Sequence, residues 1–280
     1  MRIFVAGGSG VLGRAVIPLL AGQGHEITAT SRSSSKAGLL RGLGATAVPL
    51  DAFDREATIA AVAGARPDAV LHLMTDLGTG DSASNARLRT LGTRNLVDAA
   101  RASGVSRFVG QSIAWVYPPA ADLATETDPL DLDAAEPRRT TVAAVAELEG
   151  AVRELAGGVV LRCGQLYGPE TWYSRDGRYG HAARDGELVA TETVTSFVHV
   201  SDVAQAVVLA LGWEGGVWNI VDDEPAAGVE WATGFARALG APAPRRSTSG
   251  DVGRPVSNAR ATRGGLSLAH PSWRDGFTTL

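Results

Sequence analysis

Three regularly spaced glycines follow the first apolar run of the chain. The run Arg2–Ala6 leads into the sequence GGSGVLG, which begins at Gly7, and an amphipathic helical pattern starts within it. In a strand–turn–helix unit of this kind, Gly7 permits a tight turn, Gly10 lets a ligand approach the backbone, and Gly13 lets the helix pack on the strand. The helix N-terminus then presents unpaired N–H groups to phosphate oxygens. This context predicts a dinucleotide-binding turn, with an ordinary tight turn as the alternative. Its cofactor-binding residues are expected to be Gly7, Ser9, Gly10, Val11 and Leu12.

Short apolar runs alternate with helical patterns along most of the chain. The predicted strands are Arg2–Ala6, Glu26–Thr30, Ala45–Leu50, Ala69–Thr75, Arg107–Gln111, Val159–Cys163 and Val217–Val221. The predicted helices are Val11–Leu20, Leu88–Ala102, Thr141–Leu155, Val203–Leu211 and Val229–Leu239. We expect Pro18 to kink the first helix. The alternation of helices with near-continuous apolar strands predicts an α/β fold with a Rossmann-type, doubly wound parallel sheet.

The regular order loosens after about residue 164, where Pro, Gly, Trp and polar residues cluster. We therefore predict a Rossmann domain formed by residues 1–163 and 200–221. A smaller C-terminal lobe is predicted over residues 164–199 and 222–280, and we interpret it as the substrate-binding part.

The stretch after the second predicted strand indicates which nicotinamide cofactor is favoured. NAD enzymes usually place a carboxylate there to hold the ribose 2′-OH, but residues 30–36 read TSRSSSK and contain none. Arg32 lies 19 residues after Gly13, and its guanidinium can fork onto a 2′-phosphate. NADP(H) is therefore favoured over NAD(H), with a solvated surface arginine as the alternative. Asp51, next to Ala52, is placed to accept a hydrogen bond from the adenine amino group or, alternatively, to cap the helix that follows.

Several further motifs occur in a fixed order along the chain. They are VLHLMT from Val70, GTRNL from Gly92, SIAWVY from Ser112, LRCGQLYGP from Leu161, FVHVSDVA from Phe197 and SNAR from Ser257. Together with the glycine turn, this series resembles the extended short-chain dehydrogenase/reductases and the NAD(P)-dependent epimerase/dehydratases nearly end to end. The resemblance implies an oxidoreductase whose cofactor site also includes Leu73, Met74, Thr75, Ser112, Gly164, Gln165 and Leu166.

Three positions that carry catalysis in this family are changed at once. The second serine of the family's S-S-x-x-V-Y stretch is Ile113 here. Glu149 fits the glutamate four residues after the lysine of the Y-x-x-x-K motif, so the tyrosine position is Thr141 and the lysine position is Val145. Threonine cannot replace a phenol whose pKa has been lowered, and valine carries no charge. Arg89 also stands where the family usually has asparagine. We therefore leave the catalytic residues unassigned.

Two classes of function remain open. In the first, the protein still transfers hydride, because the cofactor carries the electronics of the reaction. Among atypical family members, the chain resembles NADPH-dependent ketoreductases that act on aromatic polyketide, angucyclinone-like ketones in antibiotic biosynthesis. A phenol beside such a ketone can supply the proton. In the second class, the protein is a non-catalytic NADP(H)-binding sensor or regulator. A nucleotide-sugar epimerase or dehydratase is disfavoured, since it also needs a proton acceptor at Thr141 or Val145.

Aromatic and polar residues concentrate in the stretch TWYSRDGRYGH from Thr171. We interpret it as a wall of the substrate site, with an ordinary packed loop as the alternative. Our candidate substrate-binding residues are Trp115, Tyr173 and His181, of which Tyr173 and His181 are also candidate proton donors. Core packing is the alternative for Trp115. His72 and His199 lie in apolar strands, where we expect core histidines.

Composition argues against several other classes. The net charge of −4 and the absence of a basic stripe disfavour nucleic-acid partners. Cys163 is the only cysteine, and no Cys/His/carboxylate cluster has metal-ligand spacing. The chain opens without a charged leader and a long apolar stretch, and it contains no run of about 18 apolar residues. We therefore expect a cytoplasmic protein without a membrane span, whose oligomeric state the sequence leaves open.

Overall fold

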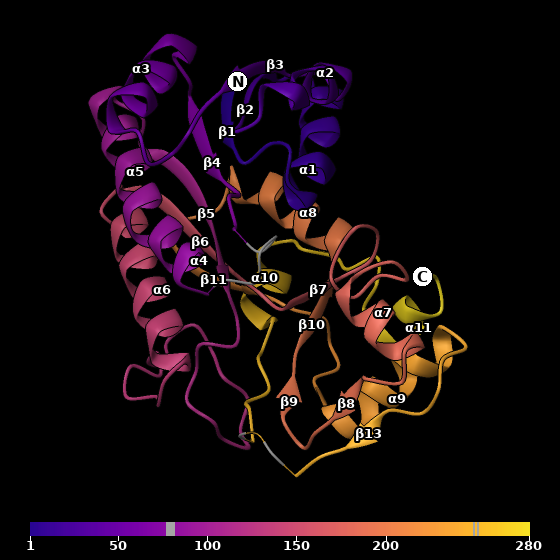
Figure 1. The fold of residues 1–280 in the computed structure, drawn as a ribbon. Coiled ribbons are helices and arrows are strands. Elements are labelled where there is room, and N and C mark those ends of the chain that lie inside the picture. The colour runs from indigo at the N-terminus through magenta and orange to yellow at the C-terminus, as the bar shows by residue number, and fades with distance from the viewer. Residues whose placement is uncertain (77–81, 249, 251) are drawn as a thin grey trace. The chain divides into compact units, whose positions relative to one another are not determined.

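A computed structural model describes residues 1–76, 82–248, 250 and 252–280 of the chain. Its main sheet has seven strands in the order β11-β6-β5-β4-β1-β2-β3 (Figure 1). These strands are β1 (Arg2–Ala6), β2 (Glu26–Ser31), β3 (Thr46–Pro49), β4 (Ala69–His72), β5 (Arg107–Ile113), β6 (Gly157–Cys163) and β11 (Gly216–Ile220). β1 pairs in parallel with β2 and β4, β2 with β3, and β4 with β5. The predicted Rossmann-type sheet is confirmed.

Two compact units make up the chain. Unit 1 comprises residues 1–112, 131–161 and 207–217, and unit 2 comprises residues 113–130, 162–206 and 218–280. The sequence-based boundaries assign residues 113–130 and 200–206 to the Rossmann domain, whereas in the structure these segments cluster with unit 2. The assignment of substrate binding to the smaller lobe stays a prediction.

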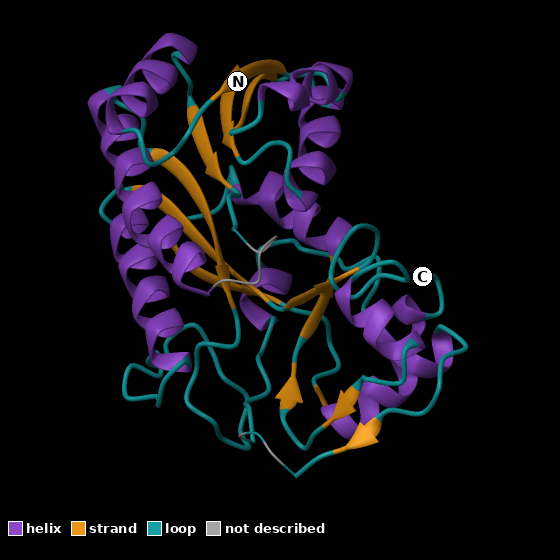
Figure 2. Cartoon of the chain, in the orientation of Figure 1, coloured by secondary structure: helices purple, strands orange, loops and turns teal. Residues whose placement is uncertain are grey.

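Helices cover both faces of the sheet of unit 1 (Figure 2). One face carries α3, α5 and α6, and the other carries α1 and α2 (Figure 1). The helices of this unit are α1 (Val11–Gly22), α2 (Ala37–Gly42), α3 (Arg55–Ala65), α4 (Ser82–Arg87), α5 (Thr93–Ala102) and α6 (Arg138–Arg153), with a 3-10 turn η1 (Ser34–Lys36) and a π-turn η2 (Leu88–Gly92). Helix α8 (Val200–Ala210) has its first residues in unit 2 and its last in unit 1. Because both faces are covered, the four successive residues of β1 after the exposed Arg2 are all apolar. Phe4 and Ala6 belong to the core under α3, α5 and α6, while Ile3 and Val5 are buried as well.

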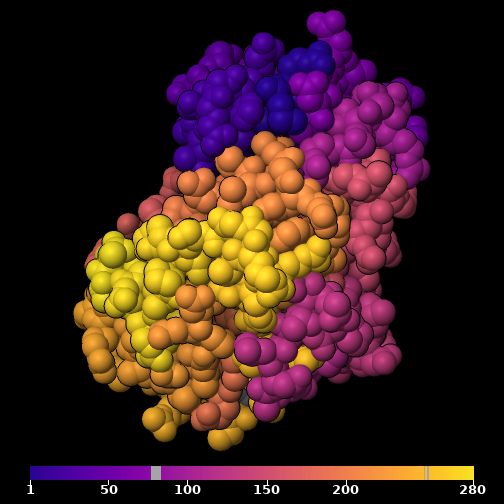
Figure 3. All heavy atoms as spheres, turned by 180° about the vertical axis from the view of Figure 1, so that it is seen from behind, coloured from indigo at the N-terminus to yellow at the C-terminus, as the bar shows by residue number. Residues whose placement is uncertain are grey.

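Unit 2 has an aromatic core of its own. Its elements are β7 (Gln165–Tyr167), α7 (Arg178–Arg184), β8 (Val189–Ala190), β9 (Val194–Thr195), β10 (Phe197–His199), β12 (Ala226–Ala227), α9 (Gly228–Ala238), β13 (Arg245–Arg246), α10 (Ala259–Arg263) and α11 (Trp273–Phe277). The ring of Phe197 has edge contacts with Tyr167, Trp231 and Phe277 at centroid distances of 6.4, 5.3 and 5.4 Å. The C-terminal stretch, yellow in Figure 3, lies on the surface beside the orange residues of the same unit. No helix among the residues that the structure describes is long and apolar enough to cross a bilayer.

Three of the differences between the structure and the sequence-based elements concern β4, the segment before α5, and α1. The predicted strand Ala69–Thr75 ends at His72, where the chain leaves the sheet. The predicted helix Leu88–Ala102 starts within a longer helical segment that contains the π-turn η2. Helix α1 continues through Pro18, which is exposed, so the backbone carbonyl that loses its helical partner can bind water.

The packing of α1 on the glycine turn gives a direct test. A Cβ at Gly13 would lie 2.5 Å from the Gly7 carbonyl oxygen and 2.6 Å from Gly8 Cα. We expect Gly13→Ala to lower the free energy of unfolding by about 1–3 kcal/mol, because both close atoms are backbone, and to weaken dinucleotide binding. Gly22→Ala in the same helix is the control, since a Cβ there meets nothing within 4 Å. Urea unfolding and a cofactor titration measure both variants, and an unchanged Gly13→Ala would contradict the packing.

Candidate functional site

The glycine turn provides a cradle at the carboxyl end of β1. Gly7 has a φ of +88°, and the N–H of Gly10 donates to its carbonyl oxygen at 3.0 Å. A Cβ at Gly7 would lie 2.9 Å from the carbonyl carbon of Leu73 and from the amide nitrogen of Met74, so only glycine fits against the end of β4. No side chain caps α1 at Gly10. The first N–H groups of this helix therefore remain for phosphate oxygens, which fits the predicted pyrophosphate site.

Arg32, the candidate 2′-phosphate residue, is joined to a carboxylate. Its Nη1 and Nη2 atoms each lie 3.3 Å from an oxygen of Asp76, and the arginine side chain is 63% exposed whereas that of Asp76 is 12% exposed. The Ser84 hydroxyl donates to Asp76 at 2.8 Å, and this bond, together with Arg32, holds the pKa of Asp76 below its usual value. Nearby, the Ser9 hydroxyl donates to Ser31 at 2.9 Å. A 2′-phosphate on Arg32 would therefore replace Asp76 as its partner.

The turn after β3 corrects one interpretation of Asp51. Its Oδ1 atom accepts the N–H of Phe53 at 3.0 Å, whereas Asp54 is the N-cap of α3 and accepts from Ala57 at 2.9 Å. The helix-cap alternative for Asp51 is therefore wrong. Asn95 donates to the carbonyl oxygen of Ala52 at 2.9 Å and fixes this turn. The contact of Asp51 with adenine stays a prediction.

His72 shapes the segment that leaves β4. The amide of Met74 donates to Nδ1 of His72 at 3.3 Å, so the ring proton is on Nε2, which donates to the Thr93 hydroxyl at 2.8 Å. Burial lowers the pKa of His72 to about 4, and the charge of Arg89 adds to this effect. Sequence reasoning assigned His72 to the core and missed this role. Thr93, the threonine of the GTRNL motif, could have indicated this role, because its hydroxyl is the partner that holds the imidazole ring of His72.

Helix α6 is expected to carry the tyrosine and lysine that relay protons in the family, and it has neither residue at these positions. Thr141, Val145 and Glu149 lie on successive turns of α6. The buried Ser112 hydroxyl, near the end of β5, donates to Glu149 Oε1 at 2.7 Å. This bond holds Ser112 against the helix that carries Thr141 and Val145, and their assignment to the family's tyrosine and lysine positions stays a prediction. Val145 is fully buried, and neither position offers a phenol or an ammonium group.

Unit 2 contains the remaining predicted cofactor residues. The backbone N–H of Gly164 donates to the carbonyl oxygen of Ile220, and the backbone N–H of Gln165 donates to that of Ser196, both at 2.9 Å. Gln165–Tyr167 forms β7, which pairs in parallel with β10 and includes Leu166. Whether these residues contact a cofactor stays a prediction.

The three candidate substrate residues of unit 2 have different surroundings. Tyr173 is 5% exposed and stacks on Tyr179 with 4.3 Å between ring centroids, and burial raises its pKa. Its ring therefore belongs to the aromatic core. The sequence did not reveal this, because core and pocket aromatic residues look alike in a sequence. Trp115 is 40% exposed. His181 is exposed on α7, and its Nδ1 lies 3.1 Å from Nη2 of Arg184.

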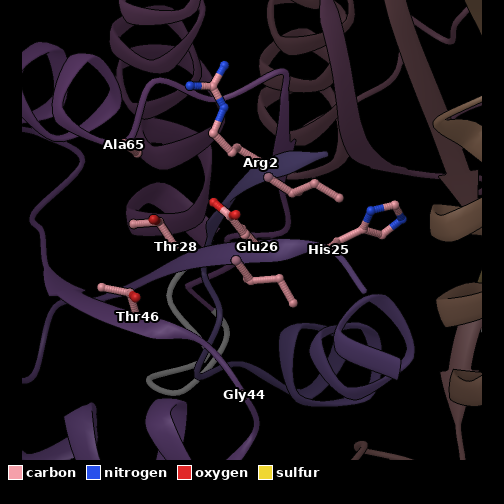
Figure 4. Close-up of a pocket in the computed structure, with 9 residues that line it drawn as sticks. Arg2, His25, Glu26, Thr28, Gly44, Thr46 and Ala65 are labelled. Atoms are coloured by element: carbon pink, nitrogen blue, oxygen red, sulfur yellow. The ribbon is translucent and has the colours of Figure 1, made fainter. Parts of the chain in front are cut away.

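A surface pocket occurs at the amino ends of the strands, at the opposite end of the sheet from the glycine turn. Its lining includes Arg2, His25, Glu26 and Thr46, from the amino ends of β1, β2 and β3 and their flanks (Figure 4). Ligands of doubly wound sheets bind outside the carboxyl ends of the strands, so we do not assign the cofactor to this pocket. Among the described residues, no group of three His, Cys, Asp or Glu side chains could hold a metal ion.

Known proteins resemble this chain over all or part of its length. The NAD dependent epimerase/dehydratase family matches residues 3–220. A 3-diazoavenalumate denitrifying reductase from Streptomyces sp. is 41% identical over 99% of each chain. A 2-alkyl-3-oxoalkanoate reductase from Stenotrophomonas maltophilia is 36% identical over 39% of this chain and 32% of its own length. The UDP-glucose 4-epimerase of Thermus thermophilus, solved with NAD, superposes with a TM-score of 0.80 at 24% identity, covering 99% of this chain and 97% of that one. The similarity to this epimerase structure bears on the fold alone.

The environment of His72 predicts a pH-dependent stability. Its folded pKa of about 4 lies below the ordinary value of 6.5, so the unfolded chain takes up the proton first as the pH falls. Stability is therefore lost from pH 6.5 down to about 4 and changes no further below that, by a total on the order of 3 kcal/mol. His72→Asn keeps an acceptor for the Met74 amide and does not titrate. Urea unfolding of both proteins from pH 7.5 to 4 isolates this contribution, and equal slopes would contradict a neutral His72.

Proposed function

Because the chain belongs to the NAD dependent epimerase/dehydratase family and is a nicotinamide-dependent reductase, we propose that it transfers hydride to an aromatic acceptor that needs no proton from the protein. One observation carries this proposal. The family's serine, tyrosine and lysine positions are Ile113, Thr141 and Val145, while the glycine turn is intact. A general acid usually contributes about 10²–10⁴-fold to the rate. An acceptor that needs no such help fits a site that has lost its proton donor.

An aromatic diazo acid is the acceptor class that we favour. The reductase that is 41% identical over nearly the full chain is named for the denitrification of such a compound. In this reaction a C–H bond forms at the ring carbon while the C–N bond breaks, and N₂ leaves with the bonding electron pair. NADPH, held by the glycine turn and Arg32, would supply this hydride, and the step itself would consume no proton. A phenolate left beside the reacting carbon takes its proton from water afterwards. No residue is therefore required at the tyrosine position.

An aromatic polyketide ketone of the angucyclinone type is the second candidate acceptor. A phenol beside the ketone hydrogen-bonds to the carbonyl oxygen and supplies the proton that the protein lacks. The relative that is 36% identical over 39% of this chain is named for a 3-oxo acid, which favours ketone reduction. Both reactions would belong to antibiotic biosynthesis, and we place the protein in the cytoplasm. Trp115 and the turn residues Gly164, Gln165 and Leu166 remain our proposed contacts for substrate and cofactor in unit 2.

One experiment separates these candidates. The purified protein is incubated with NADPH deuterated at C4 and either the diazo compound made from 3-amino-4-hydroxycinnamate or an angucyclinone ketone. Deuterium on the ring carbon together with released N₂ supports diazo reduction. Deuterium on a carbinol carbon supports ketone reduction. Tight NADPH binding without turnover of either compound would contradict both and favour the non-catalytic sensor.

The absence of a protein acid gives a further prediction. We expect kcat to stay within about threefold in Thr141→Val, Tyr173→Phe and His181→Ala, and to change little from pH 6 to 9, because no side chain donates a proton in the slow step. Steady-state kinetics measure this. A loss of about 10²-fold in any one variant would identify that residue as the donor and overturn the proposal.

The choice of NADPH rests on Arg32. We expect Arg32→Ala to raise the Kd for NADPH by about 10–100-fold, since hydrogen bonds between charged groups contribute about 1.5–3 kcal/mol, and to leave the Kd for NADH nearly unchanged. Arg41→Ala, an exposed arginine on α2, is the control. Fluorescence titration of the reduced cofactors gives both constants. Equal weakening of NADPH and NADH binding would argue against a 2′-phosphate contact.

A further inference from the structure

The π-turn η2 places a cation where the family has an amide. Leu88–Gly92 forms this turn between α4 and α5, all within unit 1. Such turns add one residue to a helix and occur frequently at functional sites. Arg89 is the second residue of the turn. The next turn of the helix carries Thr93, whose hydroxyl holds His72 at the end of β4. Arg89 therefore projects from the helix that packs beside the carboxyl end of the sheet.

Arg89 has no anionic partner among the residues that the structure describes. No hydrogen bond or ion pair joins its side chain to any of them. Arg94, five residues further on, shows the contrast, because it pairs with Asp98 and Glu154 at 2.7 Å. Arg89 is only partly exposed, and burial lowers its pKa to about 10, so it remains a cation at neutral pH. A desolvated charge without a partner is unfavourable. Among the described residues nothing neutralises the charge of Arg89, so a bound anion would stabilise it.

The neighbouring helix, α6, lacks the lysine that the family has there. Helix α6 packs against η2, and the two segments lie side by side in Figure 1. α6 carries Val145, where the family has lysine, and Thr141, where it has tyrosine. Position 145 of α6 thus carries no positive charge, whereas the turn that packs against this helix carries Arg89. The charge of Arg89 also reaches His72, at the end of β4.

We propose that Arg89 binds the carboxylate of an aromatic acid substrate and so selects acids over neutral aromatics. This assignment rests on the proposed reductase function and adds the residue that recognises the substrate. The cofactor has separate anion sites at the start of α1 and at Arg32, so the partner of Arg89 comes from the second ligand. Both reductase relatives are named for substrates that are carboxylates.

Equilibrium binding tests this proposal without turnover. The protein saturated with NADP⁺ is titrated with 4-hydroxycinnamate and with its methyl ester, by calorimetry. We expect the wild type to prefer the carboxylate at least tenfold. Arg89→Gln is expected to weaken 4-hydroxycinnamate by about 10–100-fold and to leave the ester unchanged, while Arg89→Lys keeps part of the preference because the charge remains. Arg87→Gln is the matched control, since that guanidinium lies 4.2 Å over the ring of Phe53.

Three results would overturn the proposal that Arg89 binds the carboxylate. A wild type without preference for the carboxylate, or an Arg89→Gln variant with unchanged affinity for it, overturns the proposal. A loss of NADPH affinity in Arg89→Gln overturns it as well and assigns the arginine to the cofactor. Thermal unfolding without ligand guards against misfolding, because removing a partly buried cation that has no anionic partner among the described residues should leave the melting temperature unchanged or raise it. If the carboxylate preference depends on Arg89 but neither diazo compound nor ketone is reduced, the anion site stands and the proposed reaction fails.

Discussion

The close contact between the glycine turn and the end of β4 determines how the rest of unit 1 is arranged. Gly7 lies so near the backbone of Leu73 and Met74 that no side chain fits, and Gly13 brings α1 onto the same turn. His72 fixes the chain as it leaves β4 through the Met74 amide, and Thr93 holds His72. These contacts link β1, β4, α1 and α5 within a few residues of one another. The uncapped helix N-terminus can therefore meet phosphates in a fixed geometry.

Electrostatics in this region differ from what an acid–base enzyme of the same fold requires. The positions that would hold a phenol and an ammonium group are Thr141 and Val145, and His72 is neutral because it is buried. Arg89, a cation without an anionic partner among the described residues, lies on a different helical segment, the turn η2. A cation with a pKa of about 10 orients and neutralises an anion well, but it is a poor proton donor at neutral pH. The distribution of charge thus suits binding an anionic molecule better than protonating one.

Local steric and periodic features of the fold were predictable from the sequence. The glycine spacing and the apolar runs indicated the sheet and its cofactor turn, because each depends on neighbouring residues. The π-turn was not predictable, since the extra residue in Leu88–Gly92 changes hydrogen-bond register without disturbing the apolar pattern. The end of β4 at His72 was also hidden, because Leu73 continues the apolar run and stays buried. Tyr173 was placed in a binding wall, although its neighbours in space make it a core residue. Pairings such as Ser112 with Glu149 join residues 37 positions apart and need the fold to bring them together.

The bond between Arg32 and Asp76 has a consequence for any anion that approaches this guanidinium. A phosphate that binds this guanidinium does not meet a free charge, because it must exchange with a carboxylate that is already there. Dissolved salt weakens the outgoing and the incoming contact together. Binding of an anion at Arg32 is therefore expected to vary less with ionic strength than binding at an unpaired arginine would.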